Sequence, residues 1–171
     1  MGIITNDSKE THFSIDEIKK AANEMRGYSL ISLLCAGSGH SGGVLSAMDI
    51  MAALFLRVLK HKPSNPLWPE RDRMFFSVGH KAPAWYIPLG YCGYFDIKQT
   101  ATLRKMGSPF QGHPDWKKLP GIELSRGSLG QGLSAAIGDA LAAKLDNKNY
   151  RVFCLMGDGE QQEGQIWEAV M

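Results

Sequence analysis

An aspartate between two glycines follows the clearest strand pattern in the chain. The apolar stretch Arg151–Met156 runs directly into Gly157-Asp158-Gly159. In an open parallel sheet, ligands bind outside the carboxyl ends of the strands. Glycines at such a place let a diphosphate approach the backbone, and the carboxylate of Asp158 is a hard oxygen ligand for Mg²⁺. The alternative is a tight strand-to-helix turn, in which Asp158 only assists the N-terminus of the next helix.

A second glycine-rich loop, Gly127-Ser128-Leu129-Gly130-Gln131-Gly132, leads into a helix pattern. Backbone amides at a helix N-terminus can bind anionic or polar ligand groups with help from the helix dipole. Taken alone, the loop fits equally a helix start whose glycines allow close packing.

Three histidines stand in glycine-flanked loops, at His40, His80 and His113. Each follows a different predicted element, so we expect the three side chains to share one site at the edge of the sheet. Zinc binding is disfavoured, because the spacings are long and no cysteine or carboxylate pairs with them locally. Hydrogen bonding to a phosphate or to a reacting oxygen fits better. His12 and His61 lack this setting and are expected to be solvated.

The run from Gly37 to Gly42 matches the dinucleotide fingerprint G-x-G-x-x-G letter by letter. It follows a helix pattern, whereas the fingerprint requires a preceding strand. Nicotinamide binding is therefore disfavoured.

The elements that must position these loops alternate between helix and strand. A capping box at Ser14–Glu17 predicts a helix as far as about Cys35, with an apolar stripe that includes Ile15, Ile31 and Leu34. The other predicted elements are a helix from about Ser46–Asp49, a strand at Arg73–Val78, helices at Pro83–Tyr91 and about Gly132–Leu145, a strand at Arg151–Met156 and a helix from near Gln162. This order predicts an α/β fold with an open, mostly parallel sheet and helices on both faces.

Composition limits the class of protein. The 171 residues, 44% hydrophobic and 21% charged with a net charge of +2, suit one domain over residues 1–171, with residues 1–13 as a flexible lead-in. No basic stripe predicts nucleic-acid binding, and no stretch approaches the roughly 20 apolar residues that a membrane span needs. The three cysteines are odd in number and widely spaced, which favours a reducing cytoplasm over a disulfide framework. The final helix pattern is still apolar at Met171, so we expect the chain to be part of a larger folding unit.

Together, the motifs resemble the N-terminal region of transketolases, and more closely the separate N-terminal subunit of split transketolases. They occur in the family's order over roughly residues 25 to 171. The matching stretches are Ser38–Gly43, Arg71–Arg73, Ser77–His80, Gly112–Pro114, Leu119–Glu123, Gly127–Gly132 and Gly157–Ala169. The resemblance implies the pyrophosphate-type domain of the thiamine diphosphate-binding fold, incomplete at its C-terminus.

What the resemblance implies for single residues is specific. Asp158 would bind Mg²⁺, or Ca²⁺ or Mn²⁺ in its place, while Gly157, Gly159 and His80 would contact the diphosphate. Gly127, Ser128 and Leu129 would lie against the aminopyrimidine side of the cofactor. His40 and His113 would face the substrate oxygens, and Glu163 would join a carboxylate network across a subunit interface. Ser41 and Ser128 stand where the family commonly has proline.

The implied reaction is thiamine diphosphate-dependent transfer of a two-carbon ketol unit from a ketose phosphate to an aldose phosphate, as in the pentose phosphate pathway. The family's second magnesium ligand, an asparagine, would lie beyond Met171, and the cofactor-activating glutamate belongs to another domain or subunit. We therefore expect an oligomer with a transketolase C-terminal subunit or section, and an inactive chain on its own. A deoxyxylulose phosphate synthase-like enzyme is an alternative that Gln162-Glu163-Gly164 disfavours. A non-catalytic assembly fragment is another.

Overall fold

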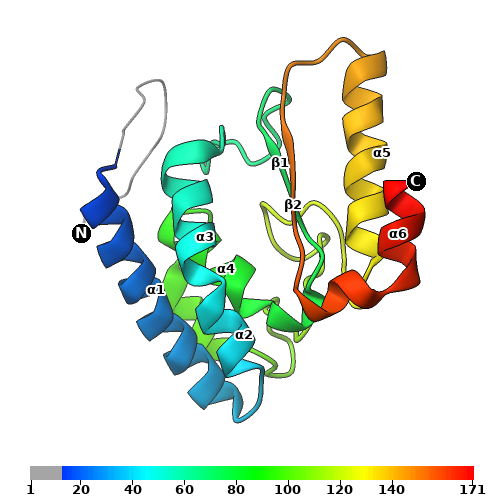
Figure 1. Ribbon diagram of the computed structural model, residues 1–171. Coiled ribbons are helices and arrows are strands. Elements are labelled where there is room, and N and C mark those ends of the chain that lie inside the picture. Colours follow the sequence, from blue (N-terminus) through cyan, green and yellow to red (C-terminus); the bar gives the residue numbers. More distant parts are fainter. Residues whose placement is uncertain (1–12) are drawn as a thin grey trace.

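The computed structural model describes residues 13–171, which form a mixed α/β fold around a small parallel sheet. Strand β1 (Arg73–Phe76) pairs in parallel with β2 (Val152–Leu155), with Arg73 opposite Val152 and Phe76 opposite Leu155. Helices lie on both sides of the two strands (Figure 1). The predicted α/β class with a parallel sheet is confirmed in this coarser form, and within residues 13–171 the sheet has two strands.

Helices α1 to α4 lie on one side of the sheet, and α5 and α6 lie on the other (Figure 1). The helical elements are α1 (Ile15–Ala36), α2 (Ser41–Ser46), α3 (Met48–Ala53), a π-helical turn (Leu54–Val58), a 3₁₀ turn (Gly79–Lys81), α4 (Pro83–Tyr91), a 3₁₀ helix (Ile97–Thr102), α5 (Gln131–Leu145), a 3₁₀ turn (Gly159–Gln162) and α6 (Gly164–Val170). The helix predicted from near Gln162 is thus a 3₁₀ turn followed by α6. Most of the predicted lead-in, including His12, lies outside the described residues. Its last residue, Phe13, is described and packs against the core.

The predicted capping box at the start of α1 is confirmed. The amide of Glu17 donates to the Ser14 hydroxyl at 3.3 Å, and the amide of Ser14 donates to the Glu17 carboxylate at 2.8 Å. The helix ends at Gly37, whose φ of +66° is a conformation that glycine adopts without strain. Both ends of α1 therefore follow from local sequence chemistry.

The predicted apolar stripe of α1 is only partly buried. Ile18 and Met25 belong to the core, whereas Ile15, Ile31 and Leu34 are exposed by 58%, 53% and 82%. At about 100° per residue, Ile31 and Leu34 lie on the side of the helix roughly opposite Ile18 and Met25, so they do not continue the buried stripe. Within residues 13–171, no other segment covers that side of α1.

The segment Ser41–Val58 forms one apolar helical run that starts earlier than predicted. The helix expected from Ser46–Asp49 begins at Ser41 and includes Gly42 and Gly43. Contrary to the expectation from sequence, the run is long and apolar enough to cross a membrane, by length and composition alone, with a mean hydropathy of 1.4 over 18 residues. Its core residues are Val44, Ala47, Met48, Met51, Ala52, Phe55 and Leu56. Packing inside the fold accounts for these core residues, which make up 39% of the run.

Helix α4 lies at the centre of the core. Its residues from Pro83 to Gly90 are all buried, and the Trp85 and Tyr86 side chains are at most 1% exposed. A helix that is apolar all round is typical of a fully buried position. Pro88 lies within the helix, so the predicted element is confirmed despite its internal proline.

Candidate functional site

Two of the three predicted site histidines lie in contact beyond the carboxyl end of β1. His40 precedes α2 and His80 lies in the 3₁₀ turn after β1, with ring centroids 5.0 Å apart in an edge-to-face arrangement. His113 belongs to a loop that passes Gly127, where a β-carbon would lie 3.9 Å from the His113 ring. The structure therefore brings the three glycine-flanked histidine loops to one edge of the sheet.

The pKa of His80 reflects this crowding. Burial lowers its pKa, and the nearby positive charges of His40, Lys81 and, more weakly, His113 lower it further, while Glu160 opposes them. A lowered pKa favours the neutral ring at pH 7, which has one N–H donor. Such a ring can donate a hydrogen bond to an anionic oxygen without adding a charge beside a divalent cation.

Glu160 is a buried residue that sequence reasoning did not assign to the site. Its carboxylate accepts hydrogen bonds from the amide of Gly130 at 2.8 Å and from the amide of Gly157 at 2.9 Å. The hydroxyl of Ser77, just after β1, also donates to it. One carboxylate, 3% exposed, thus ties both glycine-rich loops to the end of the first strand.

Spacing alone could have indicated this role. Glu160 bonds to the amide three residues before it, as the glutamate of a capping box does. The sequence Gly157-Asp158-Gly159-Glu160 contains that spacing without the usual serine or threonine at the first position. The sequence pattern singled out Asp158, whereas the carboxylate that bonds the amides of both loops is that of Glu160.

Close backbone contact explains two of the glycines. A β-carbon at Gly132 would lie 2.2 Å from Oγ of Ser77, and one at Gly79 would lie 2.7 Å from the carbonyl oxygen of Arg126. Neither position can carry a side chain without moving the backbone. Gly132 holds the Gly127–Gly132 loop against the end of β1, and Gly79 does the same for the His80 turn. The close-packing interpretation of Gly127–Gly132 therefore holds for Gly132.

Asp158 and Gly159 face solvent. Asp158 is exposed, and its side chain forms no capping hydrogen bond to the following turn and no ion pair in the described part of the chain, while its backbone carbonyl accepts from the Gln161 amide at 3.2 Å. Asp158 stands at the N-cap position of the turn without a side-chain capping bond, and the Glu160 carboxylate bonds the loop amides instead. A β-carbon at Gly159 would meet nothing within 4 Å, so its backbone borders open space.

This arrangement fits a diphosphate with magnesium. Mg²⁺ is commonly held by one or two carboxylates together with phosphate oxygens. Between residues 13 and 171, no three His, Cys, Asp or Glu side chains converge as a metal cluster, so Asp158 would be one ligand among several. Its free carboxylate lies beside the exposed Gly159 backbone, where a diphosphate could approach.

The other predicted residues lie around this centre. Gly127 and Ser128 are exposed and Leu129 is half-buried, in the loop that Glu160 holds through Gly130. Glu163 is exposed at the start of α6, where its side chain would touch a β-carbon placed on Gly130. The loop and Glu163 therefore border the same edge as the histidines.

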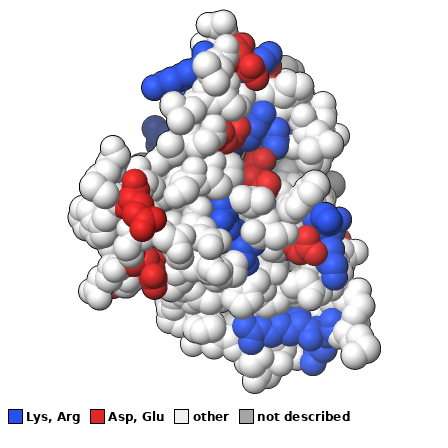
Figure 2. All heavy atoms as spheres, turned by 90° about the vertical axis from the view of Figure 1, so that its right-hand side faces the viewer, with Lys and Arg blue, Asp and Glu red and all other residues white. Residues whose placement is uncertain are grey.

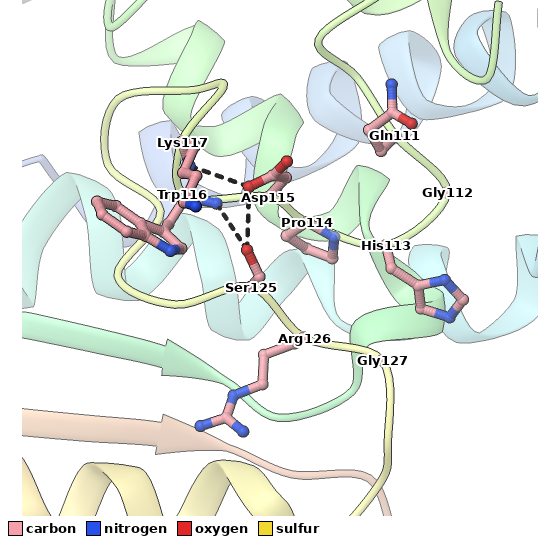
Figure 3. Close-up of a pocket in the computed structure, with 10 residues that line it drawn as sticks. All are labelled: Gln111, Gly112, His113, Pro114, Asp115, Trp116, Lys117, Ser125, Arg126 and Gly127. Atoms are coloured by element: carbon pink, nitrogen blue, oxygen red, sulfur yellow. Dashed lines mark hydrogen bonds between the residues drawn. The ribbon is translucent and has the colours of Figure 1, made fainter.

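A hollow of about 690 Å³ extends from this edge (Figure 3). It is lined by residues 111–117 and 125–127. One wall is fixed by Asp115, which accepts hydrogen bonds from the Lys117 amide and the Ser125 hydroxyl, both at 3.0 Å. His113 and Arg126 point in different directions from the wall (Figure 3). Arg126 is 8% exposed, and its Nε and Nη2 have no hydrogen-bond partner among the described residues.

His61 corrects a prediction. Instead of being solvated, it is 7% exposed, 2.8 Å from the Phe55 carbonyl oxygen through Nε2 and 3.1 Å from the Tyr94 hydroxyl through Nδ1. Its loop position gave no sign of Tyr94, 33 residues away. His61 lies in the core and apart from the three site histidines.

On the face that carries α5 and α6, charged side chains form separate groups of both signs (Figure 2).

Comparison with known proteins places this chain in a family. Residues 17–171 match the family described as transketolase, thiamine diphosphate binding domain. The chain is 44% identical to the 6-deoxy-6-sulfo-D-fructose transketolase subunit of a Clostridium species, over 91% of this chain and 56% of that protein. It is 43% identical to an apulose-4-phosphate transketolase subunit of Phocaeicola vulgatus, over 80% of this chain and 48% of that protein.

Full-length transketolases are also similar. Human transketolase is 41% identical over 91% of this chain and 25% of its own length. The crystal structure of Campylobacter jejuni transketolase matches with a TM-score of 0.85 and 37% identity, over 92% of this chain and 26% of that one. The chain thus spans about a quarter to about half the length of these relatives. Because the domain family covers nearly all the described residues and the fold matches that of solved transketolases, the chain belongs to the transketolase family, as a section or subunit that contains its thiamine diphosphate-binding domain.

Proposed function

We propose that this chain is the diphosphate- and magnesium-binding part of a transketolase that transfers a two-carbon ketol unit from a ketose phosphate to an aldose phosphate. One observation carries the proposal. The free carboxylate of Asp158 lies beside the open Gly159 backbone, on a loop that Glu160 ties to the histidine edge. The compounds in the names of two relatives, 6-deoxy-6-sulfo-D-fructose and apulose 4-phosphate, are sugars or sugar derivatives.

In this proposal, Asp158 is a ligand of Mg²⁺, with Ca²⁺ or Mn²⁺ as substitutes, and the Gly157 and Gly159 backbone borders the diphosphate. His80, whose lowered pKa favours the neutral ring, donates one N–H to a diphosphate oxygen. The Gly127–Leu129 loop lies along the aminopyrimidine. When bound, thiamine diphosphate supplies the chemistry of breaking and forming the carbon–carbon bond next to a ketose carbonyl.

His40 and His113 have the substrate-facing role. Both side chains are exposed at the histidine edge, and His113 also lines the hollow. There, imidazole groups can donate hydrogen bonds to sugar hydroxyls or stabilise charge that develops on the reacting oxygen. Exposed Glu163 is proposed to join a carboxylate network with a partner subunit.

The remaining parts of the enzyme follow from the relatives. Two of them are named as transketolase subunits, so we propose that a C-terminal transketolase subunit or section completes the site in an oligomer. This chain on its own is then expected to be inactive. The three cysteines are free thiols, and a cytoplasmic location remains part of the proposal.

Cofactor binding with and without magnesium tests the proposal. Calorimetric titration with thiamine diphosphate is expected to show binding that Mg²⁺ strengthens and a chelator weakens. Asp158→Asn is expected to lower the affinity measured with Mg²⁺ by at least about tenfold, since losing even the partners that support metal ligands costs 10–100-fold. Asp16→Asn, an exposed carboxylate on α1, is the matched control and should bind as the wild type does.

Activity is tested on the chain assembled with a transketolase C-terminal section, with ketose phosphate donors and an aldose phosphate acceptor. We expect transfer by the assembly and none by the chain alone. Equal magnesium-dependent binding by wild type and Asp158→Asn would refute the metal assignment. An assembly that binds no thiamine diphosphate would refute the function.

A further inference from the structure

Lys81 extends from the histidine turn across the site. A β-carbon at Gly43 would lie 2.7 Å from Cε of Lys81, closer than real β-carbons approach other atoms, and 3.1 Å from its Cδ. The aliphatic stem of Lys81 therefore occupies the space that a side chain at position 43 would fill. At its far end, Nζ lies 3.6 Å from the place of a β-carbon on Gly157. The ammonium group of Lys81 thus ends beside the first glycine of Gly157-Asp158-Gly159.

The described residues give this ammonium group no hydrogen bond and no ion pair. The ion pairs that the structure describes involve Lys19, Arg26, Arg71, Arg73, Lys148 and Arg151. Glu160 is the buried carboxylate near Gly157, and the Gly130 and Gly157 amides and the Ser77 hydroxyl already bond to it. Asp158, although next in sequence to Gly157, forms no ion pair with Lys81.

Histidine rings lie beside Lys81 and give its charge no partner. Lys81 follows His80 in the chain, and the His80 ring lies against that of His40. Lys81 is half-buried, and a partly desolvated ammonium without an opposite charge is unfavourable until an anion reaches it. The packing of its stem against Gly43 holds it in this position. These two facts together indicate a lysine placed to meet a ligand.

We propose that Lys81 is a diphosphate ligand, whose ammonium group donates hydrogen bonds to a phosphate oxygen of thiamine diphosphate at Gly157. This inference rests on the proposed function and adds a second cation to it, fixed in the protein and separate from the magnesium ion at Asp158. Lysine suits this role because its ammonium group is a compact charge with three donors, which binds phosphate without a fixed orientation.

Removing the Lys81 charge should weaken the binding of ligands that carry a diphosphate and spare those that carry none. Lys81→Met keeps an unbranched stem over Gly43 and removes the charge, whereas Lys81→Arg keeps a charge. Lys81→Met is expected to weaken thiamine diphosphate binding about tenfold, as for the loss of a hydrogen bond to a charged group. Thiamine, which has no phosphate, should bind with unchanged affinity, and Lys81→Arg should restore most of the diphosphate affinity. Lys20→Met, an exposed lysine on α1, is the matched control.

The experiment is a calorimetric titration of each variant with thiamine diphosphate and with thiamine, in the presence of Mg²⁺, on the chain alone and on its assembly with a transketolase C-terminal section. Reductive methylation followed by mass spectrometry adds a readout on the wild type. Bound thiamine diphosphate should protect Lys81 from methylation and leave Lys20 reactive.

The outcomes separate the two proposals. Wild type that binds thiamine diphosphate while Lys81→Met binds it equally well overturns the role of Lys81 and leaves the proposed function standing. Equal losses of thiamine and thiamine diphosphate affinity would also overturn it, because they would indicate a distorted fold. Wild type that binds no thiamine diphosphate, alone or assembled, overturns the proposed function and this inference with it.

Discussion

The two ends of the β1–β2 pair differ in how their charges are matched. At the amino end, Arg151 and Asp72 form an ion pair at 2.6 Å, and so do Arg71 and Glu123. At the carboxyl end, the described residues offer no ion pair to Asp158 or Lys81. The same two strands therefore begin in a neutralised polar network and end at charges that have no partner within the described chain.

The paired charges at the amino end stabilise the fold, whereas the unpaired charges at the carboxyl end are placed for binding. Buried or half-buried charges are stable when they are paired and hydrogen-bonded. The amino end follows that rule, and its charges fix where the strands begin. At the carboxyl end, half-buried Lys81 departs from it, at the edge where parallel sheets bind ligands, while Asp158 is exposed and carries its charge in solvent. Charges that are unpaired among the described residues are available there for a cofactor and a metal ion.

The largest effect on stability is expected at the amino end, from Asp72→Ala. Asp72 is 5% exposed and accepts hydrogen bonds from the backbone amides of Lys60, at 2.9 Å, and Arg151, at 2.8 Å, besides the Arg151 side chain. Removing the carboxylate leaves these donors without an acceptor, so we expect the free energy of unfolding to fall by about 3 kcal/mol. Urea denaturation measures it.

Asp158→Ala at the carboxyl end is the paired control for Asp72→Ala. Its carboxylate is exposed and unbonded among the described residues, so the free energy of unfolding should change by less than about 0.5 kcal/mol. A loss of stability as large as that of Asp72→Ala would mean that the two ends do not differ in the way described.

An intermediate effect on stability is expected from Glu160→Gln. Glu160 is a buried carboxylate at the carboxyl end that, unlike Asp158 and Lys81, is fully hydrogen-bonded. The glutamine oxygen can accept from one of the two amides, Gly130 or Gly157, but the NH₂ group cannot accept from the other. We expect the free energy of unfolding to fall by about 1–2 kcal/mol, because a buried amide loses its acceptor. Thiamine diphosphate affinity should fall as well, because both glycine loops depend on this carboxylate. Glu163→Gln, exposed and nearby, should leave stability unchanged.

If Glu160→Gln lowers stability but leaves the cofactor affinity unchanged, the hydrogen bonds of Glu160 to the two glycine loops stabilise the fold without affecting cofactor binding. Loss of affinity with unchanged stability would place Glu160 among the ligand-binding groups. The combined loss is the expected result, since one carboxylate connects the fold to the site.

Local chemistry explains which features the sequence could predict. The capping box at Ser14, the strand before Gly157 and the buried helix Pro83–Tyr91 depend on neighbours along the chain, and each was found. The expected burial of Ile31 and Leu34 was wrong because helical spacing puts them on the side of α1 away from Ile18 and Met25. The convergence of the histidine loops was expected from their shared glycine-flanked setting after different elements, and of the three only His80 directly follows a strand.

The residues that sequence reasoning missed depend on contacts between distant segments. Glu160 resembles a solvated residue at a helix start, and its bond to Gly130 forms only on folding. Lys81 resembles a solvated lysine after a histidine, until its stem is found against Gly43. In both cases a glycine in one loop marks the place where a side chain from another loop lies. Glycine-rich loops therefore point to the site but do not identify its charged residues.

The smallest effect is expected from His61, near the amino end, and it takes the form of a pH dependence. Burial lowers the pKa of His61 below its ordinary value of 6.5, against weaker opposing contributions from the Phe55 carbonyl and Asp72. The folded protein therefore holds the neutral ring, while the unfolded chain binds a proton more readily. Stability from this group is complete above the unfolded pKa and is lost as pH falls through it.

His61→Gln isolates this contribution, because the titration of the carboxylates is common to both proteins and cancels in the difference. At pH 7 the variant should be less stable, since glutamine replaces a ring that bonds to Phe55 and Tyr94. As pH falls from 7 to about 5, the wild type alone loses the His61 contribution, so the difference in unfolding free energy should shrink. Urea denaturation at several pH values measures it. A difference that stays constant or grows toward low pH would show that His61 gains its proton as easily in the folded protein as in the unfolded chain.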